Sequence, residues 1–70
     1  MSDVTSNMSG TVSEVLVKEN DSVEEGQEVV VLESMKMHIP IKTPAPGTVA
    51  EILVGKGDFV KTDQTLLRLK

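Results

Sequence analysis

The sequence predicts an all-β protein that forms a flattened barrel or a two-sheet sandwich. Valine and leucine supply most of the apolar residues, and the apolar stretches are short and separated by turn-forming residues. The chain also contains two copies of one segment. A helical interpretation is weak, because β-branched valines occupy positions 29–31 and three prolines interrupt positions 40–46.

The internal repeat relates residues 9–33 to residues 46–70 at a constant offset of 37, without a gap. Ten pairs are identical: Gly10 and Gly47, Thr11 and Thr48, Val12 and Val49, Glu14 and Glu51, Leu16 and Leu53, Val17 and Val54, Asp21 and Asp58, Val23 and Val60, Gln27 and Gln64, Leu32 and Leu69. A unit this small cannot bury its own apolar face. We therefore expect the two copies to pack on each other around an approximate two-fold axis.

Each copy predicts a strand, a turn, a short strand at a lone valine, a second turn and a final strand. The longer strands are predicted at residues 11–17, 28–32, 48–54 and 65–69. Gly10 and Gly47 are expected to be structural, each permitting a bend that a side chain would obstruct. Positions apolar in both copies are the core candidates: Val12 and Val49, Val15 and Ile52, Val17 and Val54, Val23 and Val60, Val29 and Leu66, Leu32 and Leu69, with Leu16 and Leu53 and Val30 and Leu67 as further possibilities.

Lys36 lies between the two copies. The repeat offset carries it to position 73 or −1, both outside the chain, so its segment is the symmetry counterpart of the two termini. Where the axis crosses the barrel, the lysine lies at the end opposite the termini. With strands on both sides and few residues between them, Lys36 is expected in a tight hairpin turn with its side chain in solvent.

Composition limits the possible functions. Seventy residues predict one domain, residues 1–70, and the absence of cysteine together with a single histidine argues against disulfides and a zinc site. A net charge of −4 with interspersed signs makes nucleic acid an unsuitable partner. No apolar run resembles a signal peptide or a membrane span, so we expect a cytoplasmic or organelle-matrix protein. A monomer is the default expectation for its oligomeric state. The Met1 start and the end just after the last predicted strand favour a complete gene product.

The residues that suggest chemistry are Glu33, Ser34, Met35, Lys36 and Met37. Exposed lysines are common and methionines often fill gaps in cores, but two methionines flanking a turn lysine on a polar surface have no packing reason. An exposed lysine amine stays protonated at neutral pH, and no apolar pocket is evident to change this. We therefore expect no catalytic residue, and any acylation of Lys36 requires a separate enzyme that supplies an activated adenylate.

At these residues the chain resembles the biotinyl/lipoyl carrier domains, specifically the biotin carboxyl carrier branch, over essentially its whole length. That branch has a Met-Lys-Met turn, often preceded by Glu and a small residue, here residues 33–37. The lipoyl branch places Asp before the lysine, so Met35 favours biotin. The resemblance implies a barrel-sandwich hybrid of two four-stranded antiparallel sheets related by a pseudo-two-fold axis.

The resemblance further implies that a biotin protein ligase attaches biotin to Lys36, and that the domain shuttles an activated carboxyl group between biotin carboxylase and carboxyltransferase components. Met35, Met37, Ser34 and Glu33 are then expected to take part in recognition by the ligase and partner enzymes. One alternative is a lipoyl carrier, with lipoate on Lys36, for acyl or aminomethyl transfer. Another is an unmodified structural or adaptor barrel. An enzyme that uses Lys36 as a Schiff base is the weakest, because this chain cannot enclose the pocket.

Overall fold

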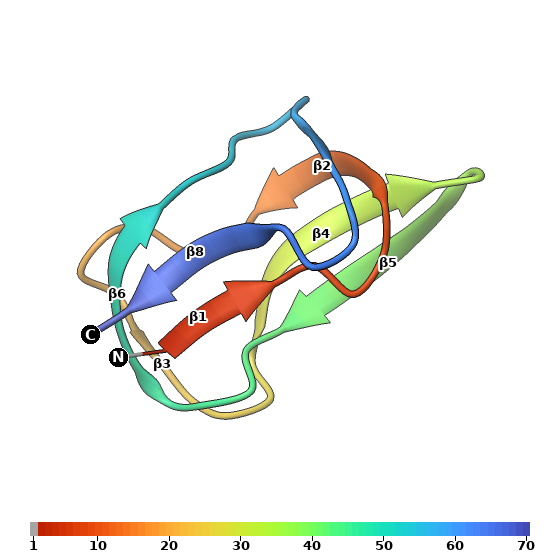
Figure 1. Cartoon of the computed structure of the whole chain (residues 1–70). Coiled ribbons are helices and arrows are strands. Elements are labelled where there is room, and N and C mark those ends of the chain that lie inside the picture. The colour runs from red at the N-terminus through yellow and green to blue at the C-terminus, as the bar shows by residue number, and fades with distance from the viewer. Residues whose placement is uncertain (1) are drawn as a thin grey trace.

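The computed structural model describes residues 2–70, which form two four-stranded antiparallel sheets that face each other (Figure 1). The terminal sheet has the strand order β1-β8-β6-β3, and the hairpin sheet has the order β5-β4-β2-β7. The strands are β1 (Ser2–Thr5), β2 (Gly10–Val15), β3 (Ser22–Val23), β4 (Glu28–Ser34), β5 (Met37–Lys42), β6 (Gly47–Ile52), β7 (Phe59–Val60) and β8 (Thr65–Leu69). The predicted all-β fold with two four-stranded sheets is confirmed.

The structural repeat is longer than the repeat found in the sequence. The offset of 37 carries β1 onto the end of β5, β2 onto β6, β3 onto β7 and β4 onto β8, so the two sheets are built alike. Val4 of β1 and Ile41 of β5 are equivalent, and both are buried. Strand β1 has no identical residue in β5, which is why the sequence repeat stopped at residue 9.

A β-bulge in each sheet explains why the apolar residues do not alternate strictly. The pairing of β2 with β4 changes register between Val12 and Glu14, and the pairing of β6 with β8 changes register between Val49 and Glu51. An extra residue on one strand reverses which face the following side chains occupy. In β2, the side chains that face the core therefore have even numbers before the bulge, as Val12 does, and odd numbers after it.

The hydrophobic core lies between the two sheets. Its buried members are Val4, Val12, Val17, Val23, Val29, Val30, Leu32, Ile41, Val49, Val54, Val60, Leu66, Leu67 and Leu69. Val15 and Ile52 are partly buried and pack against this cluster. The possible core positions Leu16 and Leu53 were wrong: they are 43% and 42% exposed, because the bulges turn them toward solvent.

The two copies hold each other through their turns. The main-chain oxygen of Asp21 accepts a hydrogen bond from the N–H of Val49 (2.8 Å), and Asp58 does the same for Val12 (2.7 Å). Each aspartate side chain also accepts a hydrogen bond from the N–H three residues earlier, at 2.9 Å and 2.8 Å. Each turn is therefore folded on itself and fixed to the other copy, which accounts for the identity of the two aspartates.

Gly10 and Gly47 are structural for a different reason than the one expected from the sequence. Neither has a positive φ. A Cβ at Gly10 would lie 2.9 Å from the main-chain oxygen of Glu33, and a Cβ at Gly47 would lie 3.2 Å from that of Lys70. These glycines permit close approach of two backbones rather than a bend.

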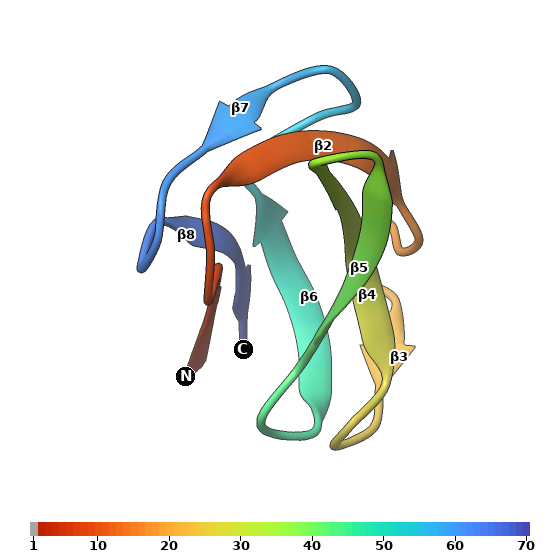
Figure 2. The same ribbon diagram turned by 90° about the vertical axis from the view of Figure 1, so that its right-hand side faces the viewer.

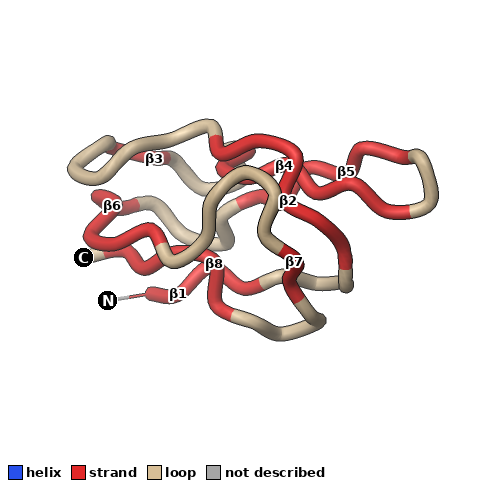
Figure 3. The backbone as a smooth tube through the Cα atoms, turned by 90° about the horizontal axis from the view of Figure 1, so that it is seen from above, coloured by secondary structure: helices blue, strands red, loops and turns tan. Residues whose placement is uncertain are grey.

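The molecule is elongated, with extents of 32 × 18 × 18 Å. The β4–β5 hairpin projects at one end, and the two termini lie at the other (Figure 1, Figure 3). This arrangement agrees with the position that the repeat offset predicts for Lys36. Within residues 2–70, no helix is long and apolar enough to cross a membrane.

Candidate functional site

The hairpin between β4 and β5 turns through only two residues. Ser34 and Met37 form the last cross-strand pair, and Met35 and Lys36 make the turn with φ values of 52° and 66°. Positive φ at both central residues is the mark of the type I′ hairpin turn, whose twist matches that of the strands. Glycine or asparagine usually fills these positions, and other residues there cost roughly 1 kcal/mol or more each. The paired strands hold this turn in spite of its side chains.

The strands behind the turn position it firmly. Behind the Ser34–Met37 pair, β4 and β5 continue in register through Glu33 and His38. Further along, Pro40 lies within β5, which is an edge strand of the hairpin sheet. An edge strand tolerates the missing N–H of proline, so the pairing of β4 with β5 continues in register past Pro40 and changes register only between Val30 and Glu28.

The turn presents its side chains to solvent. Met35 is 92% exposed, Met37 is 63% exposed, and Lys36 between them is exposed as well. The ion pairs among residues 2–70 are both made by Arg68, so within these residues the amine of Lys36 has no carboxylate partner. A primary amine is thus exposed to solvent at the tip of the hairpin.

The other two predicted site residues lie just behind the tip. Glu33 is exposed on β4, and Ser34 is half-buried at the end of the same strand. The structure therefore brings all five predicted residues to one hairpin. Their individual roles remain predictions.

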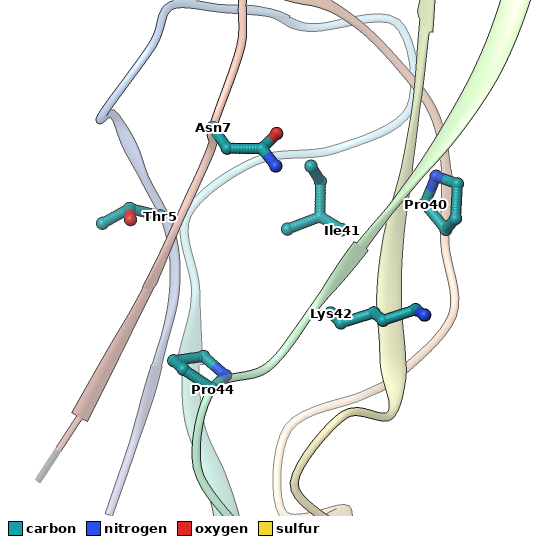
Figure 4. A pocket seen from close by; sticks show the side chains of 6 residues that line it. All are labelled: Thr5, Asn7, Pro40, Ile41, Lys42 and Pro44. Atoms are coloured by element: carbon teal, nitrogen blue, oxygen red, sulfur yellow. The ribbon is translucent and has the colours of Figure 1, made fainter.

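A hollow in the surface lies away from the lysine. It has a volume of about 310 Å³, and Figure 4 shows it between the edge strands β1 and β5, with the side chains of Asn7 and Ile41 directed toward each other. None of residues 33–37 lines this hollow. In the part of the chain that the structure describes, no three His, Cys, Asp or Glu side chains gather as metal ligands. The amine of Lys36 is thus accessible at the tip and lies outside this hollow.

Comparison with known proteins identifies the family of this chain. The family model described as "Biotin-requiring enzyme" matches residues 1–69. The chain is 47% identical over 66 residues to the biotin/lipoyl attachment protein of Bacillus subtilis (strain 168), covering 94% of this chain and 90% of that protein. It is 56% identical over 68 residues to the 2-oxoglutarate carboxylase large subunit of Hydrogenobacter thermophilus, covering 97% of this chain but 10% of that subunit.

The solved structures agree with the sequence comparisons. The urea carboxylase of Kluyveromyces lactis matches 99% of this chain with a TM-score of 0.91 and 25% identity, and the match covers 6% of that enzyme. The chain therefore corresponds to a small part of each carboxylase and to nearly all of the Bacillus protein. These findings confirm the predicted biotin carrier role, and the chain belongs to the biotin/lipoyl family of "Biotin-requiring enzyme" domains as a carrier rather than a catalytic unit.

Proposed function

We propose that biotin is joined through an amide bond to Nζ of Lys36, and that the domain carries activated carboxyl groups between the two active sites of a biotin-dependent carboxylase. The observation that carries this proposal is the two-residue turn, which holds Lys36 in solvent at the end of the molecule opposite the termini. The family match and the carboxylase relatives support biotin as the group. The exposed methionines beside Lys36 support it further, because they have no packing role.

The loading step forms one bond and breaks one. The unprotonated Nζ of Lys36 bonds to the carboxyl carbon of biotin, and the bond from that carbon to AMP in biotinyl-adenylate breaks. AMP leaves with the bonding electron pair, and the amine proton goes to solvent. A separate biotin protein ligase supplies the adenylate and activates the amine, because the solvent-exposed turn has no general base of its own. Loading removes one positive charge from the hairpin.

The domain contributes presentation and transport. When bound, biotin supplies a ureido nitrogen that takes up and releases the carboxyl group. The chain itself keeps Lys36 at the tip of a paired hairpin, so the attached group reaches into a partner's active site while the barrel stays outside. Tethering replaces a diffusing reactant by one held at high effective concentration. We further propose a cytoplasmic monomer whose partners are the ligase and the biotin carboxylase and carboxyltransferase components.

Intact mass spectrometry and peptide mapping test the attachment site. The protein is produced in cells supplied with both biotin and lipoate, as wild type, as Lys36→Arg and as Lys42→Arg. Lys42 is an exposed lysine at the end of β5, so its substitution is a matched control within the same hairpin. We expect a biotinyl increment on the peptide that contains Lys36 in the wild type and the control. Residual biotin on Lys36→Arg would contradict the proposed site.

A lipoyl carrier is the second candidate, because the Bacillus relative is named for both groups. In that case the same peptide gains a lipoyl increment, and the domain serves acyl or aminomethyl transfer. A protein that gains no increment beside active ligases would instead favour an unmodified adaptor barrel. One experiment therefore separates the three functions.

A further inference from the structure

The sulfur atoms of this chain all belong to methionines, since the sequence contains four methionines and no cysteine. Within residues 2–70, these methionines differ in their surroundings. Met8 is partly buried and packs against the hydrophobic core. Met35 and Met37 are 92% and 63% exposed at the tip of the β4–β5 hairpin. In the described part of the chain, the thioethers most accessible to dissolved reagents are therefore the two that flank Lys36.

The fold gives no reason for sulfur at these two positions. Met35 occupies the turn with a φ of 52°, a conformation that suits glycine or asparagine better. Met37 pairs with Ser34 beyond Leu32, the last residue of β4 that belongs to the core. Leucine at either position would expose a similar apolar side chain. Methionine differs from leucine by a polarizable thioether that can take up an oxygen atom.

The hairpin tip leaves both methionine side chains accessible to a small oxidant. Figure 2 views the molecule from the hairpin end, with the turn between β4 and β5 in front. Lys36 is exposed between the two methionines, and the ion pairs within residues 2–70, both made by Arg68, do not involve it. An oxygen atom added to either thioether is therefore one residue away from the lysine that the proposed function requires.

We propose that Met35 and Met37 form a reversible oxidation site for peroxides, and that their oxidation slows the loading of Lys36. The second part rests on the proposed function. A lone pair of the thioether sulfur attacks one oxygen of hydrogen peroxide, an S–O bond forms and the O–O bond breaks. Sulfur loses two electrons and becomes a sulfoxide, while the peroxide is reduced to water. Methionine sulfoxide reductases reverse the reaction: the oxygen leaves as water, and a dithiol is oxidised to a disulfide.

The removal of water from the tip links oxidation to loading. Lys36 lies between the two methionines in a two-residue turn, so an active site that encloses its Nζ also takes water away from both neighbours. A thioether loses little on this transfer, because it is apolar. A sulfoxide oxygen is a strong hydrogen-bond acceptor, and burying it without a new partner is costly. The oxidised tip therefore enters an active site less readily than the reduced tip.

Peroxide treatment followed by peptide mapping tests the oxidation site. The unloaded wild-type protein is exposed to hydrogen peroxide for increasing times, and catalase stops the reaction. Mass spectrometry then measures the oxygen increment on each methionine-containing peptide. We expect Met35 and Met37 to be oxidised about tenfold or more faster than Met8, which is protected by packing. Equal rates at these positions would overturn the oxidation site.

A purified biotin protein ligase, added after catalase, tests the effect on loading. We expect kcat/KM for loading of Lys36 to fall about tenfold when both tip methionines are oxidised. It is expected to recover after treatment with the two methionine sulfoxide reductases, one for each sulfoxide epimer, and dithiothreitol.

Two double variants separate the tip from the rest of the chain. Met35→Leu with Met37→Leu removes both sulfur atoms from the tip and keeps Met1 and Met8, so its loading is expected to be insensitive to peroxide. Met35→Gln with Met37→Gln places a polar amide at each position and is expected to load slowly without peroxide. Circular dichroism establishes that each variant is folded.

An unchanged kcat/KM in the oxidised wild type, or a leucine variant that stays sensitive to peroxide, overturns the link between oxidation and loading. If the leucine variant already loads slowly before peroxide is added, the other two measurements decide: rapid loading of the glutamine variant, or no recovery after the reductases, overturns the link. A reduced wild-type protein that no biotin ligase loads overturns the proposed function and the link with it, whereas the oxidation site is still judged by its own rates.

Discussion

Replacing Gly10 by alanine tests how closely β2 approaches the hairpin. The new Cβ would lie 2.9 Å from the main-chain oxygen of Glu33, a separation that forces one strand to move. Glu33 belongs to β4, which is paired with β2 on one side and β5 on the other, so its backbone has little freedom to withdraw. Overpacking of this kind typically costs about 1–3 kcal/mol. Alanine offsets part of that cost, about 0.4–1 kcal/mol, because it restricts the unfolded chain.

Because the backbone of Glu33 is paired on both sides, we take the upper end of the overpacking range, and we expect Gly10→Ala to lower the free energy of unfolding by about 2 kcal/mol net of the offset. This corresponds to a fall in Tm of about 8–16 °C for a domain of this size. Gly47→Ala is the matched control. Its Cβ would lie 3.2 Å from the main-chain oxygen of Lys70, a separation that a shift of a few tenths of an ångström relieves. We expect a loss below about 1 kcal/mol at this position.

Urea denaturation followed by far-ultraviolet circular dichroism measures both variants, because the chain has no tryptophan or tyrosine to report by fluorescence. The comparison is internal, since the two glycines occupy equivalent positions in the two sheets. An equal loss at the two positions, or no loss at Gly10, would refute the close-approach explanation.

Two further substitutions probe the turns. Asp58→Ala removes the carboxylate that accepts a hydrogen bond from the N–H of Gly55 at 2.8 Å. We expect Asp58→Ala and the equivalent Asp21→Ala each to lower the free energy of unfolding by about 1 kcal/mol, and the two losses to add in the double variant. Urea titrations check this, and a loss in one turn alone would show that the turns are not equivalent. Met35→Asn is expected to raise stability by about 1 kcal/mol, because asparagine adopts positive φ with less strain. If the urea titration shows no gain in stability for Met35→Asn, the hairpin turn is not strained at this position.

Much of the architecture could be predicted because the chain repeats itself. The repeat indicated two equivalent halves, and its offset indicated that Lys36 lies opposite the termini. Strand β1 was not recognised, since Val4 is its only buried residue and no position in it is identical to β5. A short polar edge strand forms because a neighbour offers hydrogen-bonding groups, here β8. Local sequence alone does not contain that information.

The order of residues along the chain is enough to place the five candidate site residues on one hairpin. Glu33, Ser34, Met35, Lys36 and Met37 are adjacent in the chain, so any tight turn between two paired strands brings them together. The sequence alone could therefore indicate an exposed lysine flanked by methionines. It could also indicate the two-fold organisation, because a repeat is a property of the chain.

Only the tertiary structure determined which face of its sheet each residue occupies and which residues it contacts. The bulges that turn Leu16 and Leu53 outward depend on the register between strands distant in sequence. The close contact of Gly10 with Glu33 depends on the same long-range pairing. The physical reason is that non-local hydrogen bonding and packing set the register, and a shift of one residue reverses every side chain beyond it.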